Sequence, residues 1–155
     1  MLKAIIADNE PGIAKLLAGL LEKHCREVMI KGMANTAIHS MRLIQQKKPD
    51  ILFLDAALLQ TDSNRLMEMV GQHSVQVIFT ADNDAFALKA IRYHALDYLV
   101  KPLDTADLIQ AVKKAVKIKN DKQLIGKQLD GLIQRYSQVP LPEQQRQPIL
   151  KDRIT

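Results

Sequence analysis

Five short apolar runs alternate with longer amphipathic stretches over the first 118 residues, and this alternation limits the possible folds more than any other feature. The runs are LKAIIA, VMIKGM, ILFL, VQVIF and LDYLV, and each is typical of a strand buried on both faces. Helical spacing of apolar residues predicts helices after Pro11, over about 36–47, 64–71 and 84–93, and from 104 onward. Strict alternation of strands and helices predicts an α/β fold, a doubly wound five-stranded parallel sheet with helices on both faces.

The composition is that of a folded chain with a single core. The sequence has 155 residues, 47% of them hydrophobic and 25% charged, which suits one domain with a tail. The net charge of +5 comes from scattered Lys and Arg, so we expect any DNA binding to reside outside this chain. One cysteine, Cys25, excludes an internal disulfide, and MLKAIIAD is too short for a signal peptide or membrane span. We expect a cytoplasmic protein without membrane contact.

Polar side chains stand at the ends of four of the five expected strands. Asp8 and Asn9 follow the first strand, Asp55 the third, Thr80 the fourth and Lys101 the fifth. Ligands of such folds bind outside the carboxyl ends of the strands, so these groups should converge on one crevice. Each position alone suits an ordinary cap or turn residue, but their joint occurrence favours a site.

This set of groups fits phosphoryl transfer. An aspartate can attack phosphorus to form an acyl phosphate, while cations neutralise the charge on the phosphoryl oxygens. Acids at neighbouring strand ends supply the hard oxygen ligands that Mg²⁺ prefers, and a lysine and a threonine hydroxyl can hold the remaining oxygens.

Four motifs occur in an order that resembles response-regulator receivers. They are Asp-x-Glu-Pro near the start, ILFLD in the middle, a TA pair, and LDYLVKP near the end, and the resemblance covers about residues 1–118. The segment TADNDAFALKAIRYHALDYLVKPLD is similar to receivers attached to LytTR-type DNA-binding domains. The resemblance implies a flavodoxin-like (CheY-like) receiver with strand order 2-1-3-4-5, acting in two-component signalling and transcription regulation.

The resemblance also assigns the chemistry of the site. It implies that Asp55 accepts a phosphoryl group from a sensor histidine kinase, and that Asp8, Asn9, Asp55 and the backbone carbonyl of Ala57 bind Mg²⁺. On this interpretation the chain is not an enzyme, apart from catalysing its own phosphotransfer and dephosphorylation.

The same resemblance assigns a switch. Thr80 and Lys101 would be the signalling pair, and the ring of Tyr98 would turn inward when Thr80 moves toward the phosphoryl group. The Lys101–Pro102 bond is expected to be cis. Phosphorylation would change the dimer contacts made by the fourth helix, fifth strand and fifth helix.

Residues 119–155 are expected to form a helical extension and a linker toward an output domain that is absent from this chain. Lys122 interrupts the apolar stripe of the extension, and Gly126 and Gly131 weaken its helix, so a dimer-forming helix and a frayed linker both stay open. The stripe consists of Ala111, Ala115, Ile118, Ile125, Leu129, Leu132 and Tyr136. VPLPEQQRQP has the composition of a linker, and the closing ILKDRIT resembles the first strand of a LytTR-type domain. A homodimer is expected.

The chain departs from the receiver pattern at three places. Asn9 replaces an acid that would touch the metal, which predicts weaker Mg²⁺ binding. Leu59, Gln60 and Ser63 stand where the family has a Pro-Gly turn and a later glycine, so that loop must close by another route. Asp82 caps the next helix or lies at the mouth of the pocket, with capping favoured.

Two other functions are compatible with the pattern. A pseudo-receiver would dimerise without phosphorylation because Asn9 and the altered loop spoil the metal site, and Asp55→Asn would then change nothing. A flavin-binding protein of the flavodoxin type shares the sheet order, but acids in the loop DNEPG would repel its phosphate.

Overall fold

The computed structural model describes the backbone of residues 1–136 and the side chains of all of these except 61–64 and 136. The expected linker VPLPEQQRQP and the closing ILKDRIT lie outside the described residues, and so does the side chain of Ser63. The chain divides into two units, Met1–Lys119 and Asn120–Thr155. The first unit contains the sheet, and the described residues of the second are helical.

A five-stranded sheet with the order β2-β1-β3-β4-β5 confirms the predicted fold, and each pair of neighbouring strands is parallel. The strands are β1 (Leu2–Ala7), β2 (Val28–Ala34), β3 (Ile51–Asp55), β4 (Gln76–Ala81) and β5 (Asp97–Val100). The helices are α1 (Pro11–His24), α2 (Ala37–Lys47), the 3-10 helix η1 (Ala56–Leu58), α3 (Leu59–Gln72), α4 (Ala87–Arg92) and α5 (Thr105–Tyr136).

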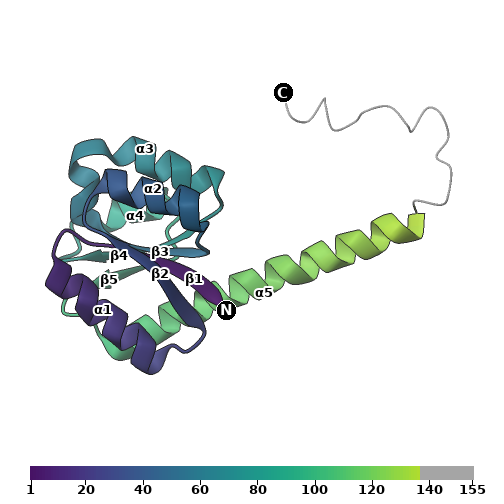
Figure 1. Ribbon diagram of the computed structural model, residues 1–155, viewed down its shortest axis with the longest axis horizontal. Coiled ribbons are helices and arrows are strands. Elements are labelled where there is room, and N and C mark those ends of the chain that lie inside the picture. The colour runs from purple at the N-terminus through teal and green to yellow at the C-terminus, as the bar shows by residue number, and fades with distance from the viewer. Residues whose placement is uncertain (137–155) are drawn as a thin grey trace. The chain divides into compact units, whose positions relative to one another are not determined.

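Helices cover both faces of the sheet, which explains why its central strands β1, β3 and β4 are buried almost without alternation. In Figure 1, α2, α3 and α4 lie over one face, and α1 and the first part of α5 lie over the other. Successive residues of β1 accordingly enter opposite cores: Ile5 packs toward α2 and α3, and Ile6 toward α1 and α5. Both side chains are almost fully buried.

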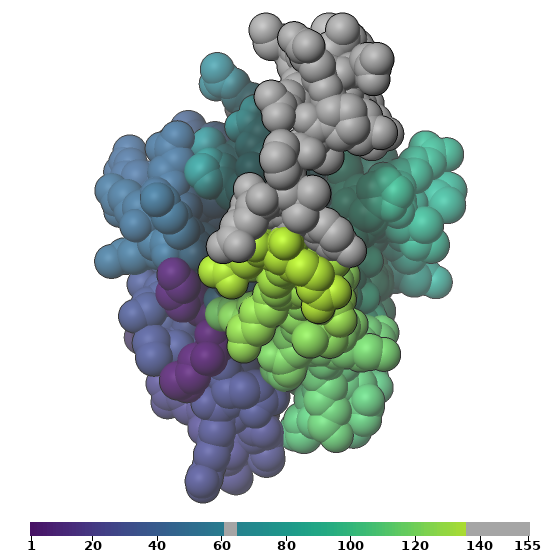
Figure 2. All heavy atoms as spheres, turned by 90° about the vertical axis from the view of Figure 1, so that its right-hand side faces the viewer, coloured from purple at the N-terminus to yellow at the C-terminus, as the bar shows by residue number. Residues whose placement is uncertain are grey.

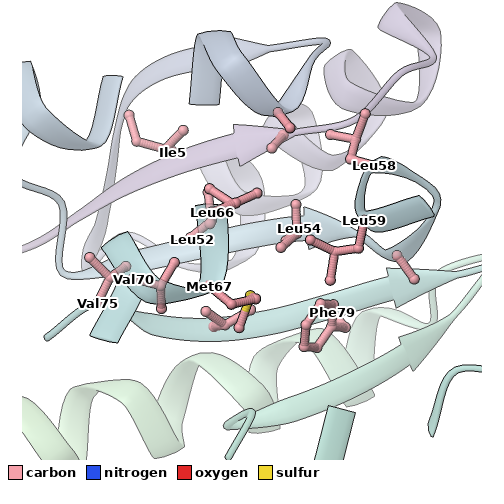
Figure 3. Close-up of a cluster of buried hydrophobic side chains, with 14 of the residues drawn as sticks. Ile5, Leu52, Leu54, Leu58, Leu59, Leu66, Met67, Val70, Val75 and Phe79 are labelled. Carbon is pink, nitrogen blue, oxygen red and sulfur yellow. The ribbon is translucent and has the colours of Figure 1, made fainter. Parts of the chain in front are cut away.

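The core between the sheet and α3 determines where that helix lies. Figure 3 shows side chains of the central strands, such as Leu52, Leu54 and Phe79, meeting Leu66 and Val70 of α3. All five side chains are at least nine-tenths buried. This core reaches the carboxyl ends of β3 and β4, so it supports the residues that follow those strands.

Two helices begin elsewhere than the sequence predicted. Helix α3 begins at Leu59 rather than Asn64, directly after η1. Residues 56–63 include no Gly or Pro that would stop a helix, and burial of Leu58 and Leu59 in the core stabilises the helical path. The loop after Asp55 therefore closes as a 3-10 turn that continues into α3.

Helix α4 begins at Ala87, not Asp84, because the preceding residues form a separate turn. Asn83 Oδ1 accepts a hydrogen bond from the Ala85 amide at 2.9 Å, and the Ala87 amide donates to the Asp84 carbonyl at 3.0 Å. The N-cap position of α4 is Phe86, which has no side-chain cap. The favoured prediction that Asp82 caps this helix is therefore wrong.

A polar anchor joins α5 to the amino ends of the central strands. Lys119 Nζ donates to the Met1 carbonyl at 2.8 Å and to Asp50 Oδ2 at 3.0 Å. The same carboxylate oxygen accepts a bond from the Lys3 amide at 2.8 Å. Figure 2 shows the first residues of the chain (purple) on the face that is turned to the viewer.

Lys48 generates a prediction about stability, because this C-cap residue of α2 has left-handed backbone angles (φ 47°, ψ 62°). An L-residue with a side chain is strained there by about 1–2 kcal/mol. We expect Lys48→Gly to increase the free energy of unfolding by about 0.5–1 kcal/mol in urea titrations. The matched control is Lys47→Gly, one residue earlier inside the helix, which should decrease it by about 1 kcal/mol. A loss of stability in Lys48→Gly would contradict this account.

Candidate functional site

Three of the predicted site residues meet in one ion-pair network at the carboxyl end of the sheet. Lys101 Nζ lies 3.0 Å from Asp8 Oδ2 and 3.4 Å from Asp55 Oδ2, although these residues are far apart in the sequence. Asp55 ends β3, whereas Asp8 and Lys101 directly follow β1 and β5. The parallel sheet therefore brings these charges together, as the sequence predicted.

Both carboxylates of this network are buried. Asp8 is 4% exposed and Asp55 5%, and only 12% of the Lys101 side chain is exposed. The second oxygen of each acid accepts a backbone hydrogen bond, Asp8 Oδ1 from the Glu10 amide at 2.8 Å and Asp55 Oδ1 from the Ala57 amide at 3.1 Å. These bonds hold each carboxylate in one orientation.

Burial and charge oppose each other at Asp55. Burial raises the pKa of its carboxyl, and the negative charge of Asp8 adds to that rise, whereas the Ala57 amide and the Lys101 ammonium lower it without cancelling it. Burial also disfavours the Lys101 ammonium, but its hydrogen bond to Asp8 and the charges of both acids outweigh this and raise its pKa. The network thus holds two acids with one cation.

Thr80 and Tyr98 lie next to the network on β4 and β5. Thr80 is buried and is the direct strand partner of Asp55. Tyr98 is half-buried, and its hydroxyl donates to the Asn83 carbonyl at 2.6 Å. This bond joins Tyr98 to the turn that follows β4. The Lys101–Pro102 peptide bond is cis, as predicted.

A cavity of about 370 Å³ opens beside Asp55 between the start of α3 and the β4–α4 turn. Sequence reasoning missed Phe86 and Lys89 in its lining, since positions in a predicted helix give no sign of a cavity, and it noted Gln60 only as a departure in the loop after Asp55. Asp82 lies in the lining as well, which supports the pocket-mouth alternative. The lining consists of Asp55, Ala56, Ala57, Leu59, Gln60, Ala81, Asp82, Asn83, Ala85, Phe86, Lys89 and Tyr98.

The donors at this end of the sheet fit a hard divalent cation that keeps several waters. Among the described residues no three His, Cys, Asp or Glu side chains group closely enough to hold a metal by themselves. Mg²⁺ commonly needs only one or two carboxylates, and Asp8 and Asp55 provide them. Asn9 is exposed beside Asp8, and the Ala57 carbonyl accepts a bond from the Leu59 amide while keeping a second lone pair.

Comparison with known proteins finds one family over most of the chain. The model of the response regulator receiver domain matches residues 4–113. An uncharacterized response regulatory protein of Vibrio cholerae is 34% identical over 118 residues, which are 76% of this chain and 49% of the relative. Transcriptional regulatory protein BtsR of Escherichia coli is 33% identical over 112 residues, 70% of this chain and 45% of its own. Sensory transduction protein LytT of Bacillus anthracis is 30% identical over 133 residues, which are 84% of this chain and 54% of the relative.

The chain spans about half the length of these curated relatives. Among solved structures, the response regulatory domain of protein mrkE from Klebsiella pneumoniae has a TM-score of 0.69 at 24% identity, covering 77% of this chain and 99% of that one. This likeness concerns the fold. In the part of the chain that the structure describes, no helix has the length and apolar character needed to cross a membrane.

The raised pKa of Asp55 predicts that Asp55→Asn stabilises the domain near neutral pH without divalent cations. Between the unfolded and folded pKa values the native state binds more protons, so stability falls as pH rises through that window. The side-chain amide of the variant does not titrate, so the variant does not lose stability as the pH rises. The difference in stability between variant and parent should disappear below the pKa that Asp55 has in the unfolded chain. Thermal unfolding in EDTA over a pH series measures the effect, with exposed Asp107→Asn as the control. A variant less stable than the parent at neutral pH would contradict the assignment.

Proposed function

This chain belongs to the response regulator receiver family, and we propose that it takes a phosphoryl group on Asp55 from a sensor histidine kinase. The observation that carries the proposal is the Lys101 ammonium shared by two buried carboxylates, 3.0 Å from Asp8 and 3.4 Å from Asp55. Asp55 alone of the two acids lines the cavity, so a donor can reach it. In this proposal Asp8 does not accept the phosphoryl group but holds Lys101 and contributes negative charge for a bound cation.

The proposed transfer uses the groups around Asp55 in separate ways. A carboxylate oxygen of Asp55 forms a bond to phosphorus while the bond from phosphorus to the imidazole nitrogen of the kinase breaks, and that nitrogen keeps the electron pair. The Ala57 amide holds the other oxygen, and Lys101 exchanges its long contact with Asp55 for a phosphoryl oxygen. A bound Mg²⁺ would supply positive charge beside Asp8 and Asp55.

The proposed response begins at Thr80 and Tyr98. The Thr80 hydroxyl would move to a phosphoryl oxygen, and Tyr98 would give up its bond to the Asn83 carbonyl and turn into the vacated space. The turn after β4 would then shift together with α4. The exposed Leu88 and Ile91 of α4 offer an apolar surface through which this shift can change the contacts of a homodimer.

We further propose that residues 1–118 are the receiver and that 119–155 lead toward a DNA-binding output domain of the LytTR type. The relatives are about twice as long as the matched region, and one of them is named as a transcriptional regulator. Control of transcription by phosphorylation would then pass from Asp55 through this extension.

A pseudo-receiver is the second candidate, and Asn9 is the observation that favours it. Asn9 lies exposed next to the buried Asp8 and lacks the charge of a second acid. Such a module would associate with partners regardless of phosphorylation.

Intact-mass analysis after incubation with Mg²⁺ and acetyl phosphate distinguishes the two candidates. We expect one phosphoryl group on the wild-type chain and none on Asp55→Asn, because only the carboxylate can attack phosphorus. The exposed Asp107→Asn variant is the matched control and should be modified like the wild type. Absence of modification across a range of Mg²⁺ concentrations would favour the pseudo-receiver.

Asn9 lacks the charge of an acid, so we expect the chain to bind Mg²⁺ weakly. We expect the Asn9→Asp variant to bind Mg²⁺ more tightly. Adding a carboxylate beside Asp8 should lower the Mg²⁺ dissociation constant about tenfold, since charged oxygens bind this ion better than neutral ones. Isothermal titration calorimetry measures both chains. Gln72→Glu adds the same charge at the other end of the sheet and should leave the affinity unchanged. Low-micromolar affinity in the wild-type chain would contradict the prediction.

A further inference from the structure

The part of α5 that follows residue 119 carries apolar side chains that no described residue covers. In a helix surrounded by water such side chains normally face a partner, because burial of their apolar surface is favourable. The exposed fractions are 56% for Leu124, 55% for Ile125, 54% for Leu129, 47% for Leu132 and 65% for Ile133.

Three of these side chains form a seam at the spacing of a two-stranded coiled coil. Ile125, Leu129 and Leu132 are separated by four and three residues, so they occupy positions d, a and d of a heptad. Leu124 lies about 100° around the helix from Ile125 and falls outside the seam, at position c. Ile133 flanks the seam at e.

The residues before the seam indicate which partner covers it. The same heptad puts Lys122 at a and Asp121 at g. When two helices pack in parallel and in register, an a side chain fits beside the g residue that precedes the partner's a position. Lys122 of one chain therefore lies beside Asp121 of the other, so each of the two Lys122 ammoniums that face each other across the seam receives a counter-charge. An antiparallel pair would separate these residues.

We propose that residues 120–136 of two copies of this chain pair as a parallel coiled coil, with Ile125, Leu129 and Leu132 as its seam. Gly126 and Gly131, at e and c, do not interrupt the seam, and a Cβ at either position would meet no atom within 4 Å. Both glycines weaken the isolated helix relative to Ala, so packing against the second copy is what stabilises the helix.

This inference deepens the homodimer of the proposed function but does not depend on phosphoryl transfer. Pairing through the extension would hold two receivers together before any signal arrives. Contacts through α4 would then form at a high effective concentration within one dimer. Asp55→Asn leaves the seam unchanged, so failure of phosphorylation and failure of pairing can be observed separately.

Sedimentation equilibrium over a concentration series tests the seam. We expect a dimer for the unphosphorylated 155-residue chain and for Asp55→Asn. Leu129→Asp should raise the dimer dissociation constant about a hundredfold by placing a charge in the seam. Leu124→Asp, the same change at nearly equal exposure on the same helix, should leave it within about threefold. A monomeric wild type, or equal effects of the two variants, would overturn the proposal.

The charges test the parallel register. Lys122→Glu should weaken the dimer because it faces Asp121 of the second copy, and Asp121→Lys combined with Lys122→Glu should restore it. Gly126→Ala should tighten the dimer through helix propensity alone. Circular dichroism and thermal unfolding of the sheet unit confirm that each variant is folded. A double variant that dimerises no better than Lys122→Glu would contradict the parallel arrangement.

Discussion

The geometry of the site depends on one ammonium shared by two buried carboxylates. Lys101 reaches Asp8 and Asp55 because β1, β3 and β5 are parallel and their carboxyl ends lie at the same end of the sheet. Two unpaired carboxylates at this depth would repel each other and lose hydration, and one cation offsets only part of that cost. The excess negative charge favours the binding of an added cation beside Asp8 and Asp55.

Most of the fold could be predicted because the strands carry an unambiguous signal. Residues such as Ile5 and Ile6 enter cores on opposite faces, and only a sheet covered on both sides requires this of adjacent positions. The meeting of Asp8, Asp55 and Lys101 follows from the same topology. The roles of these residues in phosphoryl transfer come from the family resemblance and stay predictions until they are measured.

The sequence analysis missed the starts of α3 and α4, because local burial and a side-chain hydrogen bond determine where these helices begin. The family resemblance predicts a loop after Asp55 even though the family's turn residues are absent, yet the burial of Leu58 and Leu59 extends α3 toward the site. Asp82 seemed suited to capping, but the adjacent Asn83 forms the turn instead. The cavity lining depends on where α3 and the β4–α4 turn come to rest, and no short motif encodes such a position.

The contact of Lys119 with Asp50 places the attachment of α5 at the amino end of β3, whereas Asp55 ends the same strand. The ion-pair network and the contact that attaches α5 thus lie at opposite ends of β3. Residues that tune reactivity can vary at one end without disturbing the way the chain leaves the other. Substitutions in the ion-pair network of Lys101 therefore need not alter the attachment of α5, because Lys119, Asp50 and the Met1 carbonyl lie outside that network.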